Sequence, residues 1–211
     1  MLILIEGLDF SGKSTVTPLI IEKLRSMGYS VSHKEGGGLN EGIYRQLVLW
    51  SYKQKWLPQN LVQIIYNLSP LVDKITFKRP EFNKGEVHVQ QGYIDRVISY
   101  NYANHKNFSN WFLRNSYKYF LKFDIKILIV TDLDERIKRY INSGNKNERD
   151  EKRFFTTEGL DTFKKIDRYL KKEAKKRNYL IFDNTNHSIS ETQEKIMQII
   201  IQHIHGITNE E

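Results

Sequence analysis

The stretch LILIEGLDFSGKS, residues 2–14, decides the fold. Its first part, Leu2–Ile5, is a short run of large apolar residues, which is typical of a buried strand. Directly after it, residues 7–14 have the Gly-x-x-x-x-Gly-Lys-Ser spacing of a phosphate-binding loop, and a helix-patterned segment follows. A strand, a glycine-rich turn and a helix in this order predict a parallel α/β fold that binds phosphate at the helix start.

The residue types in this loop suit a nucleoside triphosphate. Gly7 and Gly12 permit backbone angles that a Cβ atom would forbid, so successive N–H groups can converge on one point. Lys13 adds a positive charge for the β- and γ-phosphates, and the Ser14 hydroxyl is suited to bind Mg²⁺. The residues expected to contact ATP are Gly7, Asp9, Phe10, Ser11, Gly12, Lys13, Ser14 and Thr15.

Composition limits the remaining classes of protein. The chain has 211 residues, 39% hydrophobic and 27% charged, which is enough for one sizeable core, so we expect one domain over residues 1–211. The absence of cysteine excludes disulfides, thiol catalysis and cysteine-ligated zinc. The short apolar start has no basic residues before it, so it predicts a strand rather than a signal peptide or membrane span. We therefore expect a cytoplasmic protein.

The net charge of +8 raises the question of nucleic-acid binding, because much of the excess lies in residues 136–177. However, no ribonucleoprotein-type strand motif interleaves these basic residues with aromatic ones. We interpret most of them as solvated helix faces, together with a few side chains that contact phosphate.

Apolar strand patterns alternate with longer helical patterns along the chain, which predicts a five-stranded parallel sheet with helices on both faces. The predicted strands are Leu2–Ile5, Tyr29–His33, Val87–Gln91, Ile125–Val130 and Tyr179–Phe182. The predicted helices are Thr15–Met27, Gly42–Tyr52, Gln59–Lys78, Asp132–Asn142, Leu160–Arg177 and Ser190–His203. The run Ser143–Thr157 is highly charged, so we expect a mobile basic loop there, called the flap below.

Other motifs distinguish among the proteins that share a phosphate loop. A GTPase would need Asn-Lys-x-Asp, and the nearest match, residues 145–148, lacks the aspartate. A motor-type ATPase would need paired acidic residues after a strand, but no glutamate follows Asp132. A small nucleotide kinase needs neither feature, because positioning and charge neutralisation do most of the work in phosphoryl transfer.

Four segments resemble the thymidylate kinase family. The first is EGLDFSGKST, residues 6–15, and the second is HKEGGG, residues 33–38, with Gly42 following. The third is Arg-Pro and Gly-Glu at the two ends of residues 79–86, and the fourth combines Arg168-Tyr169 with YLIFD, residues 179–183. The resemblance spans nearly the whole chain, although only the phosphate loop is specific by itself.

The resemblance implies ATP-dependent phosphorylation of a deoxynucleoside monophosphate, with dTMP as the default acceptor, Mg²⁺ as cofactor and a homodimer as the assembly. It also implies that Asp9 contacts the acceptor sugar. Tyr100 matches a family residue that crowds the 2′ position, which favours deoxynucleotides. Lys34, Arg96 or both would bind the acceptor phosphate.

The sequence departs from the family after the third strand. In the gap-free register, the family's Asp-Arg-Tyr falls on Gln91-Gly92-Tyr93, while Asp95-Arg96 follows four residues later. In one interpretation the strand is longer, and Asp95 and Arg96 perform the family's role. In the other, the pair is structural and the acceptor site has been rebuilt.

A second departure concerns the base pocket. In the predicted helix Gln59–Lys78, Tyr66 matches an aromatic residue of the family, and it could stack on a nucleobase or pack in the core. The family's base-reading arginine is replaced by Pro70. The resemblance therefore leaves the identity of the acceptor open.

Position 10 is Phe, so the loop itself supplies no catalytic arginine. A cation from the flap, or from the helical segment directly before it, could instead stabilise the charge on the transferring group. The candidates are Arg139, Lys146, Arg149, Lys152 and Arg153. Of these, Arg139 and Arg149 are the favoured catalytic residues beside Lys13. The alternative functions are a deoxynucleoside kinase and a non-catalytic nucleotide-binding protein.

Overall fold

The computed structural model describes residues 1–36, 38–39, 42–144 and 147–208. Its sheet has five parallel strands in the order β2-β3-β1-β4-β5. Their bounds are β1 Leu2–Gly7, β2 Ser30–Glu35, β3 Glu86–Gln91, β4 Ile125–Val130 and β5 Leu180–Asp183. The predicted five-stranded parallel sheet is thus confirmed, with each strand within two residues of its expected bounds.

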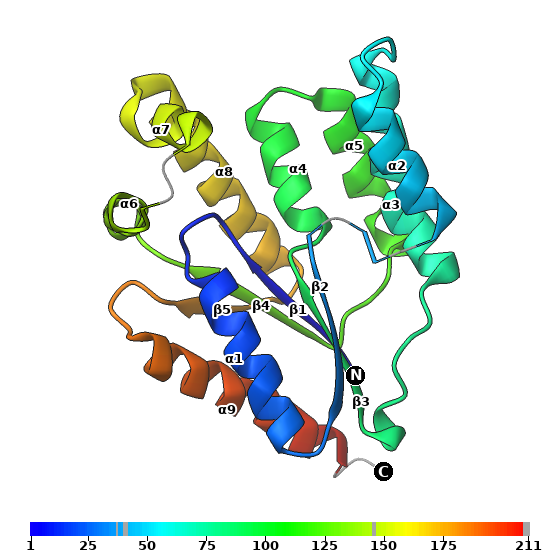
Figure 1. Cartoon of the computed structure of the whole chain (residues 1–211), viewed down its shortest axis with the longest axis vertical. Coiled ribbons are helices and arrows are strands. Elements are labelled where there is room, and N and C mark those ends of the chain that lie inside the picture. The colour runs from blue at the N-terminus through cyan, green and yellow to red at the C-terminus, as the bar shows by residue number, and fades with distance from the viewer. Residues whose placement is uncertain (37, 40–41, 145–146, 209–211) are drawn as a thin grey trace.

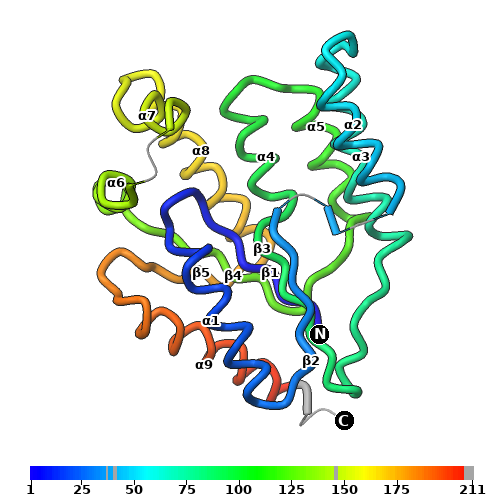
Figure 2. The backbone as a smooth tube through the Cα atoms, in the orientation of Figure 1, coloured from blue at the N-terminus to red at the C-terminus, as the bar shows by residue number. Residues whose placement is uncertain are grey.

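Helices cover both faces of this sheet, as Figures 1 and 2 show. The α-helices are α1 Lys13–Ser26, α2 Ile43–Lys53, α3 Gln59–Thr76, α4 Ile94–Ala103, α5 Asn107–Ser116, α6 Leu133–Asn142, α7 Glu148–Phe155, α8 Thr157–Lys176 and α9 Ile189–Thr208. Helices α1 and α9 lie on one face, and α4 and α8 lie on the other.

Strand β1 is the centre of the core because alternate side chains point to opposite faces. Leu2 and Leu4 belong to the apolar cluster under α4 and α8, which includes Ile98 and Ile166. Ile3 and Ile5 belong to the cluster under α1 and α9. All four β1 side chains are fully buried, so the strand is apolar throughout, as expected in a two-sided parallel sheet.

The order of the strands places the phosphate loop where the direction of winding changes. β1 pairs with β3 on one side and with β4 on the other, so the crossovers diverge at its carboxyl end. Ligands of open α/β sheets bind at such a point, because the loops leave a crevice there. Residues 8–12 occupy this position, between β1 and α1.

The flap differs from the expected loop. Among its described residues, Glu148–Phe155 form helix α7, whose N-cap Asn147 accepts a hydrogen bond from the Asp150 amide at 2.9 Å. Phe154 is buried against α8, which holds the helix in place despite its charge. The sequence expectation of a loop was therefore wrong here, because it weighed overall charge above capping and one apolar anchor. Lys146 lies outside the described residues.

One of the two interpretations of the segment after β3, that the strand continues toward Asp95 and Arg96, is wrong. β3 ends at Gln91, and helix α4 begins at Ile94, so the strand is not longer than the family register implies. Asp95 and Arg96 lie in the first turn of α4 and therefore point in different directions.

Over the described residues, no helix is both long and apolar enough to cross a membrane.

Candidate active site

The phosphate loop has the backbone geometry of an anion cradle. Gly12 adopts φ 92°, and a Cβ atom there would lie 2.5 Å from the Asn184 amide nitrogen. A Cβ atom on Gly7 would lie 2.8 Å from the Ile129 carbonyl oxygen. Both positions therefore require glycine. Helix α1 starts at Lys13, so its free N–H groups and positive dipole end face the loop.

Residues at the ends of neighbouring strands hold the loop in this shape. Asn184, directly after β5, is buried and donates from its side-chain amide to the Ser11 carbonyl at 2.8 Å. Thr131, directly after β4, donates to the same carbonyl at 3.2 Å. The Asn184 carbonyl in turn accepts from the Arg139 guanidinium at 2.8 Å. The loop is thus preorganised, and Arg139 is fixed beside it.

A cavity of about 770 Å³ opens over the loop and the start of α1. Its lining includes Gly12, Lys13 and Ser14 at one end, and His187 and Ser188 at the other. Cavities of this size hold ligands as large as a nucleotide. The expected ATP contacts Asp9, Phe10, Gly12, Lys13, Ser14 and Thr15 all line this cavity, whereas Gly7 and Ser11 support the loop from below.

Lys13 carries its charge into a crowded site. Its side chain is 7% exposed, and burial, together with the nearby Arg96 charge, lowers its pKa below the ordinary value of 10.5. The carboxylates of Glu6, Asp9 and Glu35 act in the opposite direction. A phosphate group in the cavity would add negative charge next to Lys13, so the cradle suits a polyanion.

The surroundings of Ser14 fit a bound Mg²⁺. The Gln91 side chain reaches it from the end of β3, donating to the Ser14 hydroxyl at 3.1 Å. The other Gln91 side-chain atom, Oε1, is buried and has no hydrogen-bond partner among the described residues. A hydroxyl oxygen and a free carbonyl oxygen are ligands for a hard cation or for its water molecules. Over the described residues, no group of three or more acidic or histidine side chains is arranged so that it could hold a metal ion.

The end of β1 connects the loop to β3. The Glu6 carboxylate is completely buried and accepts a hydrogen bond from the Tyr93 amide at 2.5 Å. Its second oxygen accepts from the Gly7 amide at 3.4 Å. Glu6 therefore fixes the start of the phosphate loop to the segment between β3 and α4.

Asp9 is the point at which three elements meet. Arg153 of α7 donates to its carboxylate at 2.5 Å, Arg96 of α4 lies 3.5 Å away, and the Tyr100 hydroxyl also lies at 3.5 Å (Oδ2). Burial by itself would raise the pKa of Asp9, but Arg153 and Arg96 outweigh burial and hold that pKa below 3.8. The structure therefore brings together Asp9, Arg96 and Tyr100, three predicted acceptor residues.

Asp95 has different surroundings. Its side chain is completely buried and accepts hydrogen bonds from the Tyr117 hydroxyl at 3.1 Å, from Tyr179 and from Arg177. Tyr117 directly follows α5, and Arg177 and Tyr179 lie between α8 and β5, so these partners do not belong to the phosphate loop. The prediction that Asp95 contacts an acceptor is corrected by this placement, because its oxygens are already bound within the core.

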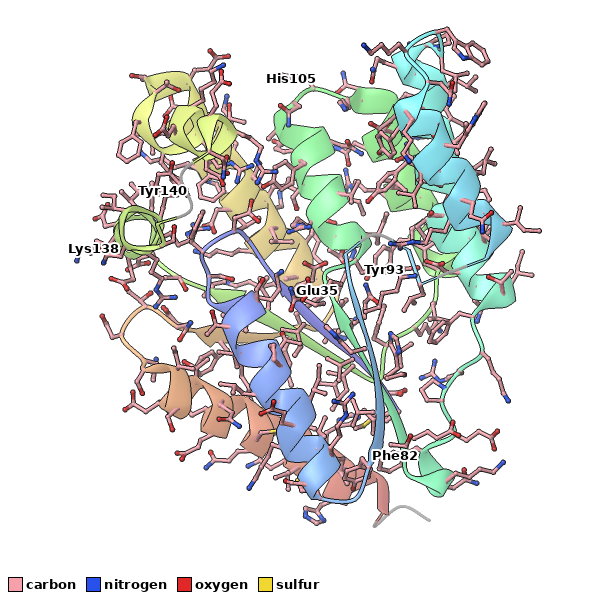
Figure 3. All side chains as sticks on the ribbon, in the orientation of Figure 1. Glu35, Phe82, Tyr93, His105, Lys138 and Tyr140 are labelled. Atoms are coloured by element: carbon pink, nitrogen blue, oxygen red, sulfur yellow. The ribbon has the colours of Figure 1, made fainter. Side chains whose placement is uncertain are left out.

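Tyr66 lines a second cavity of about 270 Å³, between the end of β2 and helices α2 and α3. Glu35, Arg45 and Ser69 share its lining, and Figure 3 labels Glu35 near this edge of the sheet. Burial and the charge field of neighbouring side chains raise the pKa of Tyr66 to about 12, so its hydroxyl stays protonated. Tyr66 thus lines a pocket rather than the closed core.

Lys34 does not line the cavity that contains Tyr66. It is buried and lines a different hollow, of about 730 Å³, together with His33 and Phe77. The basic residue of this region that does line the Tyr66 cavity is Arg45. The sequence prediction of Lys34 as an acceptor ligand is therefore not supported by its position.

The described candidate cations divide into two groups: two that line the large cavity, and two whose charges are already paired elsewhere. Arg139 and Arg149, the two favoured catalytic residues, line the large cavity over the loop. Arg149 is 72% exposed and pairs with Asp150 at 3.3 Å, so its guanidinium can swing toward a ligand. Arg153 is only 12% exposed and is already bound to Asp9. Lys152 pairs with Glu148 on the outer surface of α7.

Sequence reasoning missed several residues that the structure places in the site. Gln91, Glu35, Asn184 and Arg45 were not predicted. The first three lie at or just after the carboxyl end of a strand, whereas Arg45 lies in the first turn of α2. Polar residues at that edge are the available signal, because ligands bind there in parallel sheets.

Comparison with known proteins agrees with this geometry. The sequence model described as "Thymidylate kinase" matches residues 5–196. The chain belongs to the thymidylate kinase family. The resemblance predicted from the four motifs is confirmed, and it supports a nucleoside monophosphate kinase.

Two curated relatives carry the same name. A thymidylate kinase from Exiguobacterium sp. is 32% identical over 101 residues, which are 47% of this chain and 48% of that protein. A probable thymidylate kinase from Sulfolobus acidocaldarius is 26% identical over 197 residues, 92% of this chain and 93% of that protein. The chain is therefore a distant member whose match to the first relative spans about half of that protein.

Solved structures show the same fold. Thymidylate kinase from Ehrlichia chaffeensis superposes with a TM-score of 0.61 at 16% identity, covering 95% of this chain and 98% of that one. The enzyme from Candida albicans gives 0.63 at 19% identity, covering 95% and 91%. The predicted phosphate-loop kinase fold is thus confirmed.

Proposed function

We propose that this protein transfers the γ-phosphoryl group of ATP to a deoxynucleoside monophosphate, with dTMP as the acceptor. The observation that carries this proposal is the position of Asp9. It lines the large cavity over Lys13, and its carboxylate lies 3.5 Å from the Arg96 guanidinium. A donor and an acceptor could thus meet at one loop.

In this reaction an oxygen of the acceptor phosphate attacks the γ-phosphorus of ATP, the bond to the β–γ bridging oxygen breaks, and ADP leaves. The loop amides and Lys13 hold the donor phosphates, and Arg139 and Arg149 neutralise negative charge that builds up on the transferring group. The Ser14 hydroxyl, supported by Gln91, would hold Mg²⁺, which neutralises the β- and γ-phosphates when bound.

On the acceptor side, Arg96 is suited to bind the monophosphate. Glu6 and Asp9 raise its pKa above the ordinary value despite its burial, so it remains charged. Tyr66 is suited to contact the base, and Tyr100, next to Asp9, lies where a sugar would be read. Arg45, which lines the Tyr66 cavity, supplies a further cation on the acceptor side, in the role expected of Lys34.

A coupled assay with ATP and a panel of acceptors tests this proposal. The panel contains dTMP, dUMP, dCMP, UMP, thymidine and deoxycytidine, and we expect the largest kcat/KM with dTMP. Turnover of thymidine or deoxycytidine but of no monophosphate would indicate a deoxynucleoside kinase. ATP binding without turnover of any acceptor would contradict the transferase function and leave only nucleotide binding.

We extend the proposal to assembly and location: a homodimer in the cytoplasm. Support comes from family membership and from large apolar side chains that stay exposed on α2 and α3. These are Ile43, Leu47, Leu49, Trp50 and Tyr52 on α2, and Leu61, Ile64 and Ile75 on α3. Sedimentation equilibrium would test the assembly, and a monomer at micromolar concentration would contradict it.

A further inference from the structure

Phe10 has a backbone conformation that is unusual for its residue type. Three described residues other than glycine have positive φ: Phe10 at 63°, His105 at 54° and Asn178 at 55°. Asparagine and histidine visit this region with local side-chain support, whereas a bulky aromatic residue there is a genuine outlier. Such a conformation persists only when the surrounding structure holds it in place.

The contacts of the Phe10 ring supply that support. It packs edge-on against Tyr140 of α6 at 5.4 Å and against Phe154 of α7 at 5.6 Å, measured between ring centroids. Tyr140 and Phe154 are themselves 5.4 Å apart, and Phe154 packs edge-on against Phe163 of α8 at 5.2 Å. Tyr140 is labelled in Figure 3, beside α6. We call Phe10, Tyr140, Phe154 and Phe163 the aromatic cluster; its last three members are almost completely buried.

This cluster lies next to the ion pairs of the loop. Two consecutive loop residues, Asp9 and Phe10, contact two consecutive residues of α7, Arg153 and Phe154. The Arg153 guanidinium lies 2.5 Å from Asp9 and 3.1 Å from Asp150, and 5.2 Å from the centre of the Phe163 ring. The apolar and the charged contacts therefore fix the same helix to the same loop.

We propose that Phe10 is a positioning residue: its ring holds helix α7 in register with the phosphate loop, so that Arg153 stays on Asp9 and Arg149 faces the donor phosphates. The inference rests on the proposed phosphotransferase function. The strained backbone of Phe10 is what aims the ring away from the loop and toward α6 and α7. Phe10 lines the large cavity, and its phenyl ring carries no charge and no hydrogen-bonding group, so the ring acts through packing.

The substitution Phe10→Gly separates positioning from mere packing. Glycine adopts positive φ without strain, so the variant relieves the backbone while removing the ring. We expect the melting temperature to fall, because the loss of a packed ring outweighs the relief of backbone strain, so both readouts are taken well below the unfolding midpoint. We expect amide exchange in α7 to rise about tenfold, since local opening depends on local contacts, and exchange in α9 to stay constant.

Kinetics supply the second readout. We expect kcat of Phe10→Gly to fall about tenfold with the KM for ATP nearly constant, the pattern of a lost transition-state contact. Phe10→Tyr keeps the ring, so it should show the wild-type rate of amide exchange in α7 and the wild-type kcat. The matched control is Phe108→Ala, which removes a 63% exposed phenylalanine from α5 and should leave α7 exchange and kcat unchanged.

Two outcomes would overturn the proposal. One is unchanged exchange in α7 for Phe10→Gly. The other is an unchanged kcat when Phe10→Gly is assayed well below its unfolding midpoint. Should Phe10→Gly fail to fold, Phe154→Leu removes the opposite ring of the contact and must give the same two effects. Exchange needs no turnover, so it tests the positioning role even if the wild-type enzyme phosphorylates no acceptor.

Discussion

The carboxyl ends of β1 and β3 lie side by side in the sheet, yet they relate to the sequence in opposite ways. After β1, the phosphate loop has the expected motif, the expected backbone and a cavity over it. After β3, the expected Asp-Arg pair is replaced by Gln91-Gly92, and Arg96 reaches the site from α4 instead.

The difference shows which chemistry is tied to the backbone. Loop amides can converge on phosphate only with glycine at fixed positions, so the spacing of that motif cannot drift. A guanidinium on a long side chain can reach the same point from a neighbouring turn. The acceptor side can therefore be rebuilt with new residues, whereas the donor side cannot.

The largest effect should come from the loop itself. Lys13→Ala should lower kcat/KM roughly a thousandfold, because it removes a preorganised charge from the transferring phosphates. Steady-state assays with ATP and dTMP measure this loss. Lys23→Ala, an exposed lysine of the same helix, is the matched control and should have wild-type rates. A loss below tenfold for Lys13→Ala would contradict the donor assignment.

Asp95 and Arg96 are neighbours whose substitutions should separate stability from catalysis. Asp95→Asn weakens the ion pair between Asp95, which is completely buried, and Arg177, whose side chain is 11% exposed, so it should cost about 3 kcal/mol of unfolding free energy. Thermal unfolding would show this as a lower melting temperature, by about 6–12 °C. The folded fraction at 25 °C should retain its KM for dTMP. A raised KM with unchanged stability would instead place Asp95 in the acceptor site.

Arg96→Ala should give the reverse pattern, with lower activity and nearly unchanged stability. Loss of a charge-assisted contact to the acceptor phosphate should lower kcat/KM for dTMP about 10- to 100-fold. ATP binding, followed by calorimetry, should change little. Arg114→Ala, an exposed arginine on α5, is the control for a general change in charge. Equal losses for both variants would argue against a specific phosphate contact.

Asp9 should give the protein an acid-sensitive contribution to stability. Its folded pKa lies below the ordinary 3.8 because Arg153 and Arg96 outweigh its burial. The contribution is therefore fully present above pH 3.8 and is lost as the pH falls through the lower folded pKa. Urea unfolding between pH 3 and 7 measures it. Asp9→Asn should flatten this part of the profile, and an unchanged acid limb would contradict the ion pairs.

The smallest effect should come from Gln91. Gln91→Glu adds a negative charge beside the Ser14 hydroxyl, so the Mg²⁺ concentration needed for half-maximal rate should fall about threefold to tenfold. Equilibrium binding of Mn²⁺ to the enzyme–nucleotide complex gives an independent readout. If the metal requirement does not change, the Gln91 side chain does not lie near the cation.

Sequence alone determined the elements whose signal is local. The apolar runs of the central strands, the helix patterns and the glycine spacing of residues 7–14 each depend on neighbours in the chain, so periodicity and motif could predict them. The helical state of Glu148–Phe155 was missed because part of its stability comes from packing Phe154 against Phe10, far away in the sequence.

Only the tertiary structure decided which residues meet. Arg153 reaches Asp9 across 144 positions of sequence, and Asn184 reaches Ser11 across 173. Asp95 and Arg96 are adjacent in the chain, but successive helical residues point about 100° apart. The Asp95 side chain therefore lies in the core, and the Arg96 side chain lies beside Asp9 in the site. Side-chain direction depends on where the helix starts and what it packs against, and no local pattern encodes either.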